Sequence, residues 1–512
     1  MFKKKIYILY ISIIMENTAK VEMEAMGSVP IGLRYSAGVS PGVPGERALQ
    51  RFTAENASVF SGSGNNVVRI PVSSGHFLDL KNAVLGYDFK NTTTGGGGVD
   101  TSITLDGSAA CVIQRIRILD SRSSNEIERV DSYNLVHSVL DQYSSNLTNM
   151  QGSNILSGAP RRIQNNPATG TVALTQASKT GTDSAGTQYT IGTLTGQAIT
   201  INSGLGGKGY VQEEADSLNT GISRHYEFGL KNGWFNPASA KYLPPMVAFT
   251  IELTLAPPAN CLKKETNAVP GYNAQNFMLS IPSVTLTDPA FQARMNQRLA
   301  QGVSWRATTF HHHVNTLAAG AGRTSVQLGE RARVLKGFMN IMRIQSNVTD
   351  GDKFKLSKRS IQYVDNYQYQ IGSTLYPNNQ IDIVTEATPV DGGTAANTRL
   401  AGKTEQNMNI SEAYSELLRV VGGINSSAGT TLIGQEPFAQ SELNNGAGLL
   451  ALDLQTYSDG SVSSGINTSN GLPCVINVQK NSAANVILQL DSFAIAELQI
   501  MINPDGIITS MS

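Results

Sequence analysis

The chain contains three consecutive histidines, His311-His312-His313, and imidazole nitrogens are common ligands of zinc and other transition metals. In a strand, His311 and His313 would share one face and His312 would point to the other. Two ligands do not close a tetrahedral zinc site, and no cysteine or acidic residue lies nearby in the sequence to complete one. We therefore expect these histidines in a polar loop or on the surface of a strand, without a metal.

Two glycine-containing motifs resemble nucleotide-binding loops. Residues 204–209 match the letters of a dinucleotide motif, but that motif needs a buried strand before it and a helix after it, and the flanking sequence favours neither. Gly402-Lys403-Thr404 resembles the end of a phosphate loop, yet Asn397 stands where the first glycine is required. We interpret both segments as ordinary loops.

Other combinations of reactive side chains are equally unspecific. There is no Gly-x-Ser-x-Gly nucleophile motif, and the carboxylates Glu213, Glu214 and Asp459 are interpreted as solvated surface groups. The short basic patches at residues 161–162 and 353–359 are more consistent with solvated or subunit-contact surfaces than with nucleic-acid recognition. The sequence thus predicts no catalytic, cofactor-binding or metal-binding residues and no enzymatic activity.

Composition supports a β-rich protein with long loops. The chain has 512 residues, 40% of them hydrophobic and only 15% charged, with 49 glycines. The formal net charge is zero, so no overall positive field would attract nucleic acid. Cys111, Cys261 and Cys474 lie far apart in apolar, strand-like sequence, where a thiol usually behaves as a small buried hydrophobic group. Folding in a reducing compartment is therefore expected.

The N-terminus imitates a secretory signal peptide. Three lysines at residues 3–5 precede an apolar run at residues 6–14, but no small-residue cleavage site follows. The run is also shorter than the roughly 20 residues that span a bilayer. We expect translation to begin at Met15, with residues 1–14 untranslated, and a true secretory leader is the alternative.

The second half of the chain repeats the order of elements in the first half. Each half has a pair of hydrophobic strands, a further strand, a short amphipathic helix, a long polar stretch and closing strands. In the first half the strand pair is expected at residues 77–89, the further strand at 112–119 and the helix at 131–143, and the polar stretch starts at 144 and is followed by strands through 286. In the second half the corresponding segments are 333–344, 361–371 and 411–421, and the polar stretch starts at 422 and is followed by strands through 508.

The strands and helices follow from the spacing of apolar residues. Residues 247–255 alternate cleanly between apolar and polar side chains, which is the strongest strand signal in the chain. Residues 131–143 and 411–421 place apolar side chains three and four positions apart, as one face of a helix requires, and Gly422-Gly423 is expected to end the second helix. A further helix is expected at residues 291–300, after Asp288-Pro289.

These patterns predict a β-protein of two large domains. Residues 1–64 are expected to form an N-terminal extension and arm, residues 65–290 the first β-domain, residues 291–303 a linker, and residues 304–512 the second β-domain. The polar stretch at about 144–222 is too long for a structureless loop in a compact domain. We expect a surface excursion that carries short strands such as residues 171–174 and 197–201.

Several of these segments are typical of one family. Ile113-Gln-Arg-Ile-Arg-Ile precedes a helical stretch within residues 127–140, and Tyr367-Gln-Tyr-Gln-Ile-Gly-Ser-Thr-Leu-Tyr-Pro377 precedes Ser411-Glu-Ala-Tyr-Ser-Glu-Leu-Leu-Arg419. Residues 449–456 and 493–505 fit closing strands. Across residues 65–508 the chain resembles the double jelly-roll major capsid proteins of double-stranded DNA viruses, particularly the polinton-like, adintovirus and virophage branch.

The resemblance implies an all-β fold of two tandem eight-stranded jelly-roll sandwiches, each with a short helix and long loop insertions. It implies a homotrimeric, pseudo-hexagonal capsomer of an icosahedral virion shell that is assembled inside the host cell. Neighbouring capsomers, penton proteins and minor capsid proteins would be its partners. The insert would project as a tower, and the arm would run under an adjacent capsomer. No cofactor, sequence-specific nucleic-acid binding or transmembrane segment is expected.

Two other functions are compatible with the residues. A secreted β-sandwich that binds carbohydrate or mediates adhesion is the main alternative, because of the apolar N-terminal run and the Thr/Asn-rich loops. A β-sandwich glycosidase with a pair of acidic residues is the second. It is disfavoured because an aromatic content of 7%, with two tryptophans, offers few platforms for stacking sugars.

Overall fold

The computed structural model describes residues 45–144, 156–158, 163–165, 179–182, 188–191, 210–212, 218–236, 242–264, 267–383, 410–424, 438, 446–457, 464–481 and 485–512. The chain divides into two compact units, residues 46–285 with 293–512, and residues 1–45 with 286–292. In the smaller unit, Asp288 Oδ1 accepts a hydrogen bond from the backbone N–H of Ala290 at 2.9 Å. This bond caps the start of α5 (Pro289–Leu299), which confirms the helix predicted at residues 291–300.

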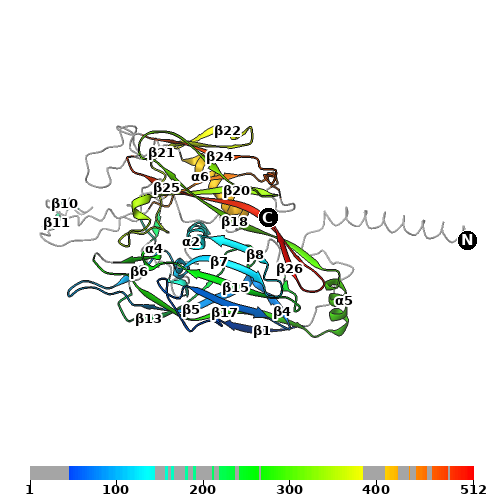
Figure 1. Ribbon diagram of the computed structural model, residues 1–512. Coiled ribbons are helices and arrows are strands. Elements are labelled where there is room, and N and C mark those ends of the chain that lie inside the picture. The colour runs from blue at the N-terminus through cyan, green and yellow to red at the C-terminus, as the bar shows by residue number, and fades with distance from the viewer. Residues whose placement is uncertain are drawn as a thin grey trace, which may run out of the picture. The chain divides into compact units, whose positions relative to one another are not determined.

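The first half of the chain forms one β-sandwich within the larger unit (Figure 1). One sheet has the order β13-β5-β17-β4-β14, with β1 and β2 also paired to β17, and the other has the order β3-β15-β7-β8. The strands are β1 (Gly45–Thr53), β2 (Val59–Phe60), β3 (Val67–Ser73), β4 (Phe77–Asp79), β5 (Val84–Asn91), β7 (Ile113–Asp120), β8 (Glu126–Asp131), β13 (Ser223–Gly229), β14 (Tyr242–Leu243), β15 (Ala248–Leu255) and β17 (Tyr272–Leu286).

The second half forms another sandwich, in which the two longest strands run antiparallel side by side (Figure 1). One sheet has the order β18-β25-β20-β23, with β26 also paired to β25, and the other has the order β19-β24-β21-β22. The strands are β18 (Val303–Leu317), β19 (Gly322–Leu328), β20 (Leu335–Ile344), β21 (Val364–Ile371), β22 (Thr374–Asp382), β23 (Leu450–Asp453), β24 (Cys474–Lys480), β25 (Leu488–Ile502) and β26 (Ile508–Met511).

The two sandwiches have the same topology, strand for strand. The sheet members β1, β17, β5 and β13 correspond in chain order and in pairing to β18, β25, β20 and β23. Likewise β3, β15, β7 and β8 correspond to β19, β24, β21 and β22. A helix separates the fifth and sixth of these eight strands in each half, α2 (Tyr133–Ser144) and α6 (Ser411–Ile424). Two eight-stranded jelly rolls in tandem are therefore confirmed.

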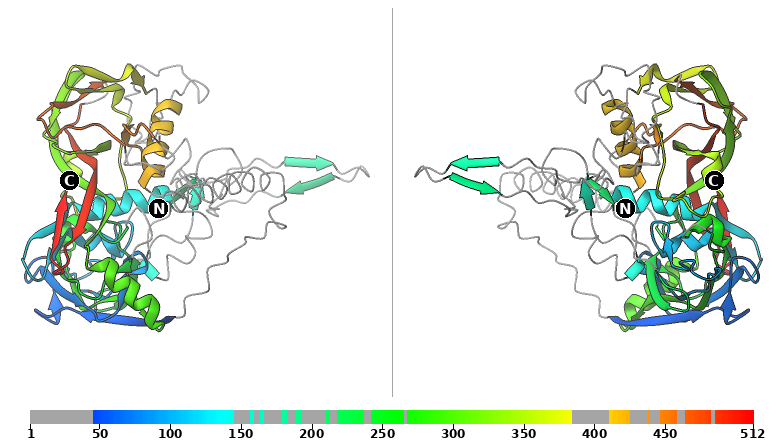
Figure 2. Two further views of the ribbon diagram at one scale, coloured as in Figure 1. Left: turned by 90° about the vertical axis from the view of Figure 1, so that its right-hand side faces the viewer. Right: turned by 90° about the vertical axis from the view of Figure 1, so that its left-hand side faces the viewer.

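Smaller elements connect these strands. They are the 3-10 turns η2 (Leu80–Asn82), η3 (Ala109–Val112) and η4 (Gln345–Asn347), the helix α4 (Pro258–Cys261), the pair β6 (Ile103–Leu105) with β16 (Leu262–Lys264), the pair β9 (Ile163–Asn165) with β12 (Tyr210–Gln212), and the pair β10 (Lys179–Thr182) with β11 (Gln188–Ile191). Figure 2 shows β10 and β11 as an antiparallel ribbon. The insert thus carries short strands, although the predicted segments 171–174 and 197–201 lie outside the described residues.

Alternation of apolar and polar residues explains the packing of the sheets. In β7, Ile116 and Ile118 are buried in the core, while Arg115 and Arg117 lie on the outer face. There Arg117 forms ion pairs with Glu126 of β8 at 2.6 Å and with Glu252 of β15 at 2.8 Å, so cross-strand charges reinforce the register of three neighbouring strands.

Some boundaries differ from those predicted. Residues 45–64, predicted as part of the arm, contain β1 and β2, which pair with β17. Residues 486–490 and 493–502 were predicted as two strands, but residues 488–502 form the single strand β25, because Asp491 and Ser492 are buried polar residues that do not interrupt the ladder. The expected stop at Gly422-Gly423 is wrong, since α6 continues to Ile424. Among the described helices, none is long and apolar enough to cross a membrane.

Candidate functional site

Buried carboxylates of the first sandwich bind groups of the second, and Glu128 of β8 is the first of them. Its Oε1 accepts hydrogen bonds from the Thr309 hydroxyl of β18 at 2.9 Å and from the backbone N–H of Gly233 at 2.8 Å. Its Oε2 accepts bonds from Asn232 Nδ2 at 2.6 Å and from the backbone N–H of Trp234 at 2.8 Å. Burial raises the pKa of this carboxyl, and the four hydrogen bonds offset only part of that effect.

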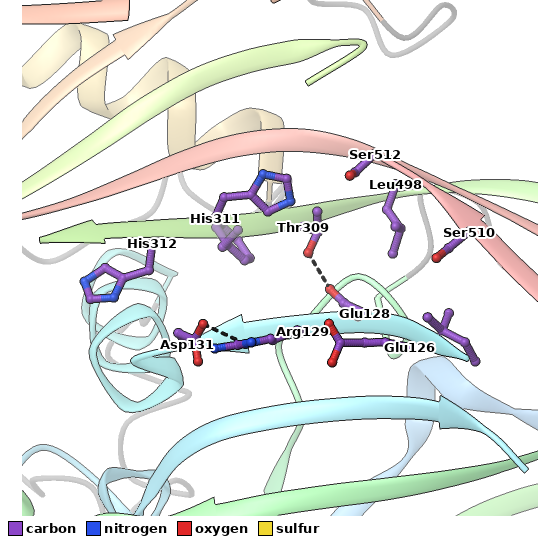
Figure 3. Close-up of a pocket in the computed structure, with 12 residues that line it drawn as sticks. Glu126, Glu128, Arg129, Asp131, Thr309, His311, His312, Leu498, Ser510 and Ser512 are labelled. Carbon is purple, nitrogen blue, oxygen red and sulfur yellow. Dashed lines mark hydrogen bonds and ion pairs between the residues drawn. The ribbon is translucent and has the colours of Figure 1, made fainter. Parts of the chain in front are cut away.

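A cavity of about 380 Å³ lies beside Glu128, between β8 and the face of the sheet that contains β18 (Figure 3). Figure 3 shows Glu128 facing Thr309 across this space, and Trp234 and Trp305 pack together nearby with ring centroids 5.8 Å apart. Asp131, which also lines the cavity, is paired with Arg115 and Arg129. At the cavity, Asp131 is thus held by two arginines and Glu128 by four neutral hydrogen-bond donors.

Asp106 is the second buried carboxylate, and it caps a turn of the other sandwich. Its Oδ2 accepts the backbone N–H groups of Lys355 at 2.6 Å and Leu356 at 2.7 Å. Its Oδ1 accepts the backbone N–H of Ser357 at 3.0 Å and the Ser357 hydroxyl at 2.6 Å. Asp106 is 1% exposed, and it provides the acceptors for three backbone donors, of which those of Lys355 and Leu356 are buried.

Lys355 makes the reciprocal connection. Its Nζ donates hydrogen bonds to the carbonyl oxygens of Ala259, of Leu262 at 3.3 Å and of Asp350 at 2.9 Å. Burial lowers the pKa of this ammonium group, and the charge of Asp106 counteracts that effect. Two of the three carbonyl groups that hold the side chain, those of Ala259 and Leu262, thus belong to the first half, and the backbone is held by Asp106.

Helix α2 adds three further bonds to the second half. Ser138 Oγ donates to the Leu356 carbonyl at 3.2 Å and Gln142 Nε2 to the Ser357 carbonyl at 2.8 Å. Tyr143 OH donates to the Ala447 carbonyl at 2.9 Å. We call these contacts together the seam, defined by Asp106, Glu128, Ser138, Gln142, Tyr143 and Lys355. It joins the two sandwiches through directional hydrogen bonds between buried groups.

The three histidines lie on β18 and alternate as predicted. His311 Nδ1 and His313 Nε2 both contact the carboxylate of Glu330, at 2.9 and 3.1 Å. His312 points to the opposite face, where it contacts Asp491 at 3.0 Å and stacks on Phe493. Asp491 is also paired with Arg343. Across the described residues, no group of three or more His, Cys, Asp and Glu side chains is arranged to hold a metal ion.

The pKa values of the Glu330 cluster shift in opposite directions. Burial raises the pKa of Glu330, but hydrogen bonds from His311 and His313 outweigh burial and lower it to about 2. Burial lowers the pKa of His311, but the bond to Glu330 and the charges of Glu330 and Glu128 outweigh burial and raise it above 6.5. The charged His311–Glu330 pair is therefore favoured in the folded protein.

We expect this pair to make stability depend on pH. A histidine with a raised pKa stabilises the folded state below its unfolded pKa, and that contribution is lost as pH rises through the folded value. Between pH 6 and pH 8.5, the free energy of unfolding should therefore fall by about 1–2 kcal/mol more in the wild type than in His311→Gln. Thermal unfolding at half-unit pH steps measures this. His76→Gln, at an exposed histidine bonded to Thr285, is the control and should keep the wild-type pH slope.

Several candidate residues of the sequence lie outside the described residues, namely 161–162, 204–209, 213–214, 402–404 and 459. The basic patch at residues 353–359 is described, and its predicted solvated or subunit-contact role is wrong for Lys355 and Arg359. These side chains are 2% and 0% exposed, because the segment packs inside the molecule. Cys111, Cys261 and Cys474 are buried free thiols, as predicted.

The residues of the seam carry no local sequence signal. Asp106 and Lys355 are 249 positions apart and Glu128 and Thr309 are 181 apart. Each is surrounded by ordinary turn or strand sequence. Asp106, for example, lies in the turn-like sequence Thr104-Leu-Asp-Gly-Ser108, which gives no indication of burial.

Known proteins are similar to this chain in fold rather than in sequence. No protein-family model and no curated protein matches the sequence. Among solved structures, a chain of the PBCV-1 virus capsid is 10% identical, with a TM-score of 0.52 over 93% of this chain and 99% of that chain. The Faustovirus major capsid protein is 11% identical, with a TM-score of 0.54 over 91% of this chain and 92% of that chain.

Both matches span nearly all of this chain, so they cover both sandwiches. At this level of identity the agreement concerns the path of the backbone and not individual side chains. Combined with the strand-for-strand duplication, it shows that the chain has the double jelly-roll fold seen in viral major capsid proteins.

Proposed function

We propose that this chain is the major capsid protein of a double-stranded DNA virus and forms trimeric, pseudo-hexagonal capsomers of an icosahedral shell. The observation that carries the proposal is the tandem repetition of one eight-stranded topology in a single chain. Three such chains around a threefold axis place six similar sandwiches in a ring. A ring of that kind tiles a hexagonal lattice from one gene product.

The seam supports this role. A shell component needs its two sandwiches in a fixed relation, because a lattice contact on one sandwich must be in register with contacts on the other. Buried hydrogen bonds to charged groups give such a fixed geometry, since bending the junction would leave them unpaired. The role requires no catalysis, and the carboxylates of Glu128 and Asp131 at the cavity make structural hydrogen bonds and ion pairs. Neighbouring capsomers, penton proteins and minor capsid proteins would be the partners, in the virion.

The oligomeric state of the purified full chain tests the proposal. We expect native mass spectrometry to give the mass of three 54.7-kDa chains and the complex to survive hundredfold dilution. Electron microscopy should show threefold particles with a hexagonal outline. A stable monomer that does not assemble under any salt condition would contradict the proposal. The secreted, carbohydrate-binding alternative instead predicts a cleaved leader and binding to polysaccharides, and a tandem duplication does not follow from it.

A further inference from the structure

Arg359 is a fully buried arginine in the connection between β20 and β21. Its backbone N–H donates to the Gly446 carbonyl at 2.7 Å, so the residue is fixed in the interior close to the seam. Its side chain is 0% exposed. Within the described part of the chain, Nε, Nη1 and Nη2 have no hydrogen-bond acceptor. None of the five N–H donors of this guanidinium group therefore has a partner among the described residues.

The neighbouring groups do not neutralise this charge. The carboxylate of Asp106, whose charge acts on Arg359, already accepts four bonds from residues 355–357. Tyr143 is neutral, because burial raises the pKa of its hydroxyl well above the physiological range. Arg343 is positively charged and is itself paired with Asp491. The end of α2 at Tyr143 supplies only the weak partial charge of a helix terminus.

Arg359 nevertheless remains charged at neutral pH. Burial lowers the pKa of its guanidinium group only to about 10, with the charge of Arg343 also lowering it. A buried charge without a counter-charge is strongly destabilising, so buried ions in proteins are normally paired. The hydroxyl of Ser360, the next residue, is also buried without a partner in the described residues. Two adjacent residues thus present unused polar groups in one interior region.

We propose that Arg359 binds a small inorganic anion, such as phosphate or chloride, taken up from solution as the chain folds. The planar fork of a guanidinium group suits an oxyanion, which it binds through two parallel N–H···O bonds. The bound anion provides the missing acceptors and neutralises the charge beside the seam. Occupancy of the site then couples the anion concentration to the stability of the junction between the sandwiches.

Thermal unfolding of the purified full chain tests this site. At constant ionic strength, sodium gluconate is replaced stepwise by sodium phosphate or by sodium chloride, because gluconate is too bulky for an interior site. We expect the Tm of the wild type to rise by about 2–4 °C when the small anion reaches a hundredfold excess over its dissociation constant. Arg359→Met should lose this response. Arg306→Met is the control: it removes an arginine whose side chain is 56% exposed, and this variant should keep the wild-type response to the anion.

Arg359→Lys serves as a second variant if Arg359→Met does not fold. Lysine retains the positive charge but lacks the planar guanidinium group that makes two parallel hydrogen bonds. The Tm of this variant should therefore rise only at a several-fold higher phosphate concentration than that of the wild type. An equal response of wild type and Arg359→Met would overturn the proposal. So would a wild-type Tm that is independent of all small anions.

Discussion

Replacement of Asp106 by alanine is expected to lower the free energy of unfolding by about 3–5 kcal/mol, the range typical for removing one partner of a buried charged network. The substitution removes the acceptor of the backbone N–H groups of Lys355, Leu356 and Ser357, and the bonds of the first two are buried. Each such donor loses its solvation without compensation. Urea denaturation followed by tryptophan fluorescence measures the change, since Trp234 and Trp305 both lie in the interior.

A matched control separates this effect from the loss of any aspartate. Asp100 lies in an exposed loop and accepts one backbone hydrogen bond, from Ser102 at 2.8 Å. Asp100→Ala should therefore cost less than about 1 kcal/mol. If Asp106→Ala cost no more than Asp100→Ala, the carboxylate would not be what joins residues 355–357 to the first sandwich. Calorimetry adds a second readout, because weakening the seam should broaden or split the unfolding transition.

Glu128→Gln is expected to destabilise the protein by about 2–4 kcal/mol, even though the two side chains have nearly the same shape. The reason is that each carboxylate oxygen accepts a bond from a backbone N–H group, Oε1 from Gly233 and Oε2 from Trp234, and a backbone N–H can only donate. An amide nitrogen in place of either oxygen would therefore face a donor, although the Thr309 hydroxyl and a flipped Asn232 amide could accept from it. Equilibrium unfolding in urea gives the size of the effect.

Glu126→Gln is the control on the same strand. Glu126 lies two residues earlier on β8, and its carboxylate is partly exposed and pairs with Arg117 at 2.6 Å. Because solvent screens such a pair, its loss should change stability by less than about 1 kcal/mol. Equal effects of the two substitutions would contradict a specific role for Glu128.

The sequence by itself determined the elements and their repetition. Apolar and polar side chains alternate in residues 247–255, and apolar side chains recur every three or four positions in residues 131–143. Both patterns follow from the local geometry of a strand and a helix, so β15 and α2 were predictable from neighbouring residues alone. The order strand, strand, helix, polar stretch and strands occurs twice, and this order indicated a tandem fold. The strand β18 was less evident, because its polar residues His311–His313 interrupt the apolar pattern that marks a strand.

Only the tertiary structure decided which residues share the interior between the sandwiches. Asp106, Glu128, Lys355 and Arg359 look like surface residues in sequence, because the free energy that justifies burying a charge depends on partners up to 250 positions away. No local pattern records those partners. The continuity of β25 across Asp491 has the same cause, since Arg343 and His312 satisfy that carboxylate from other strands. Periodicity is a property of neighbouring residues, whereas satisfaction of buried polar groups is a property of the whole fold.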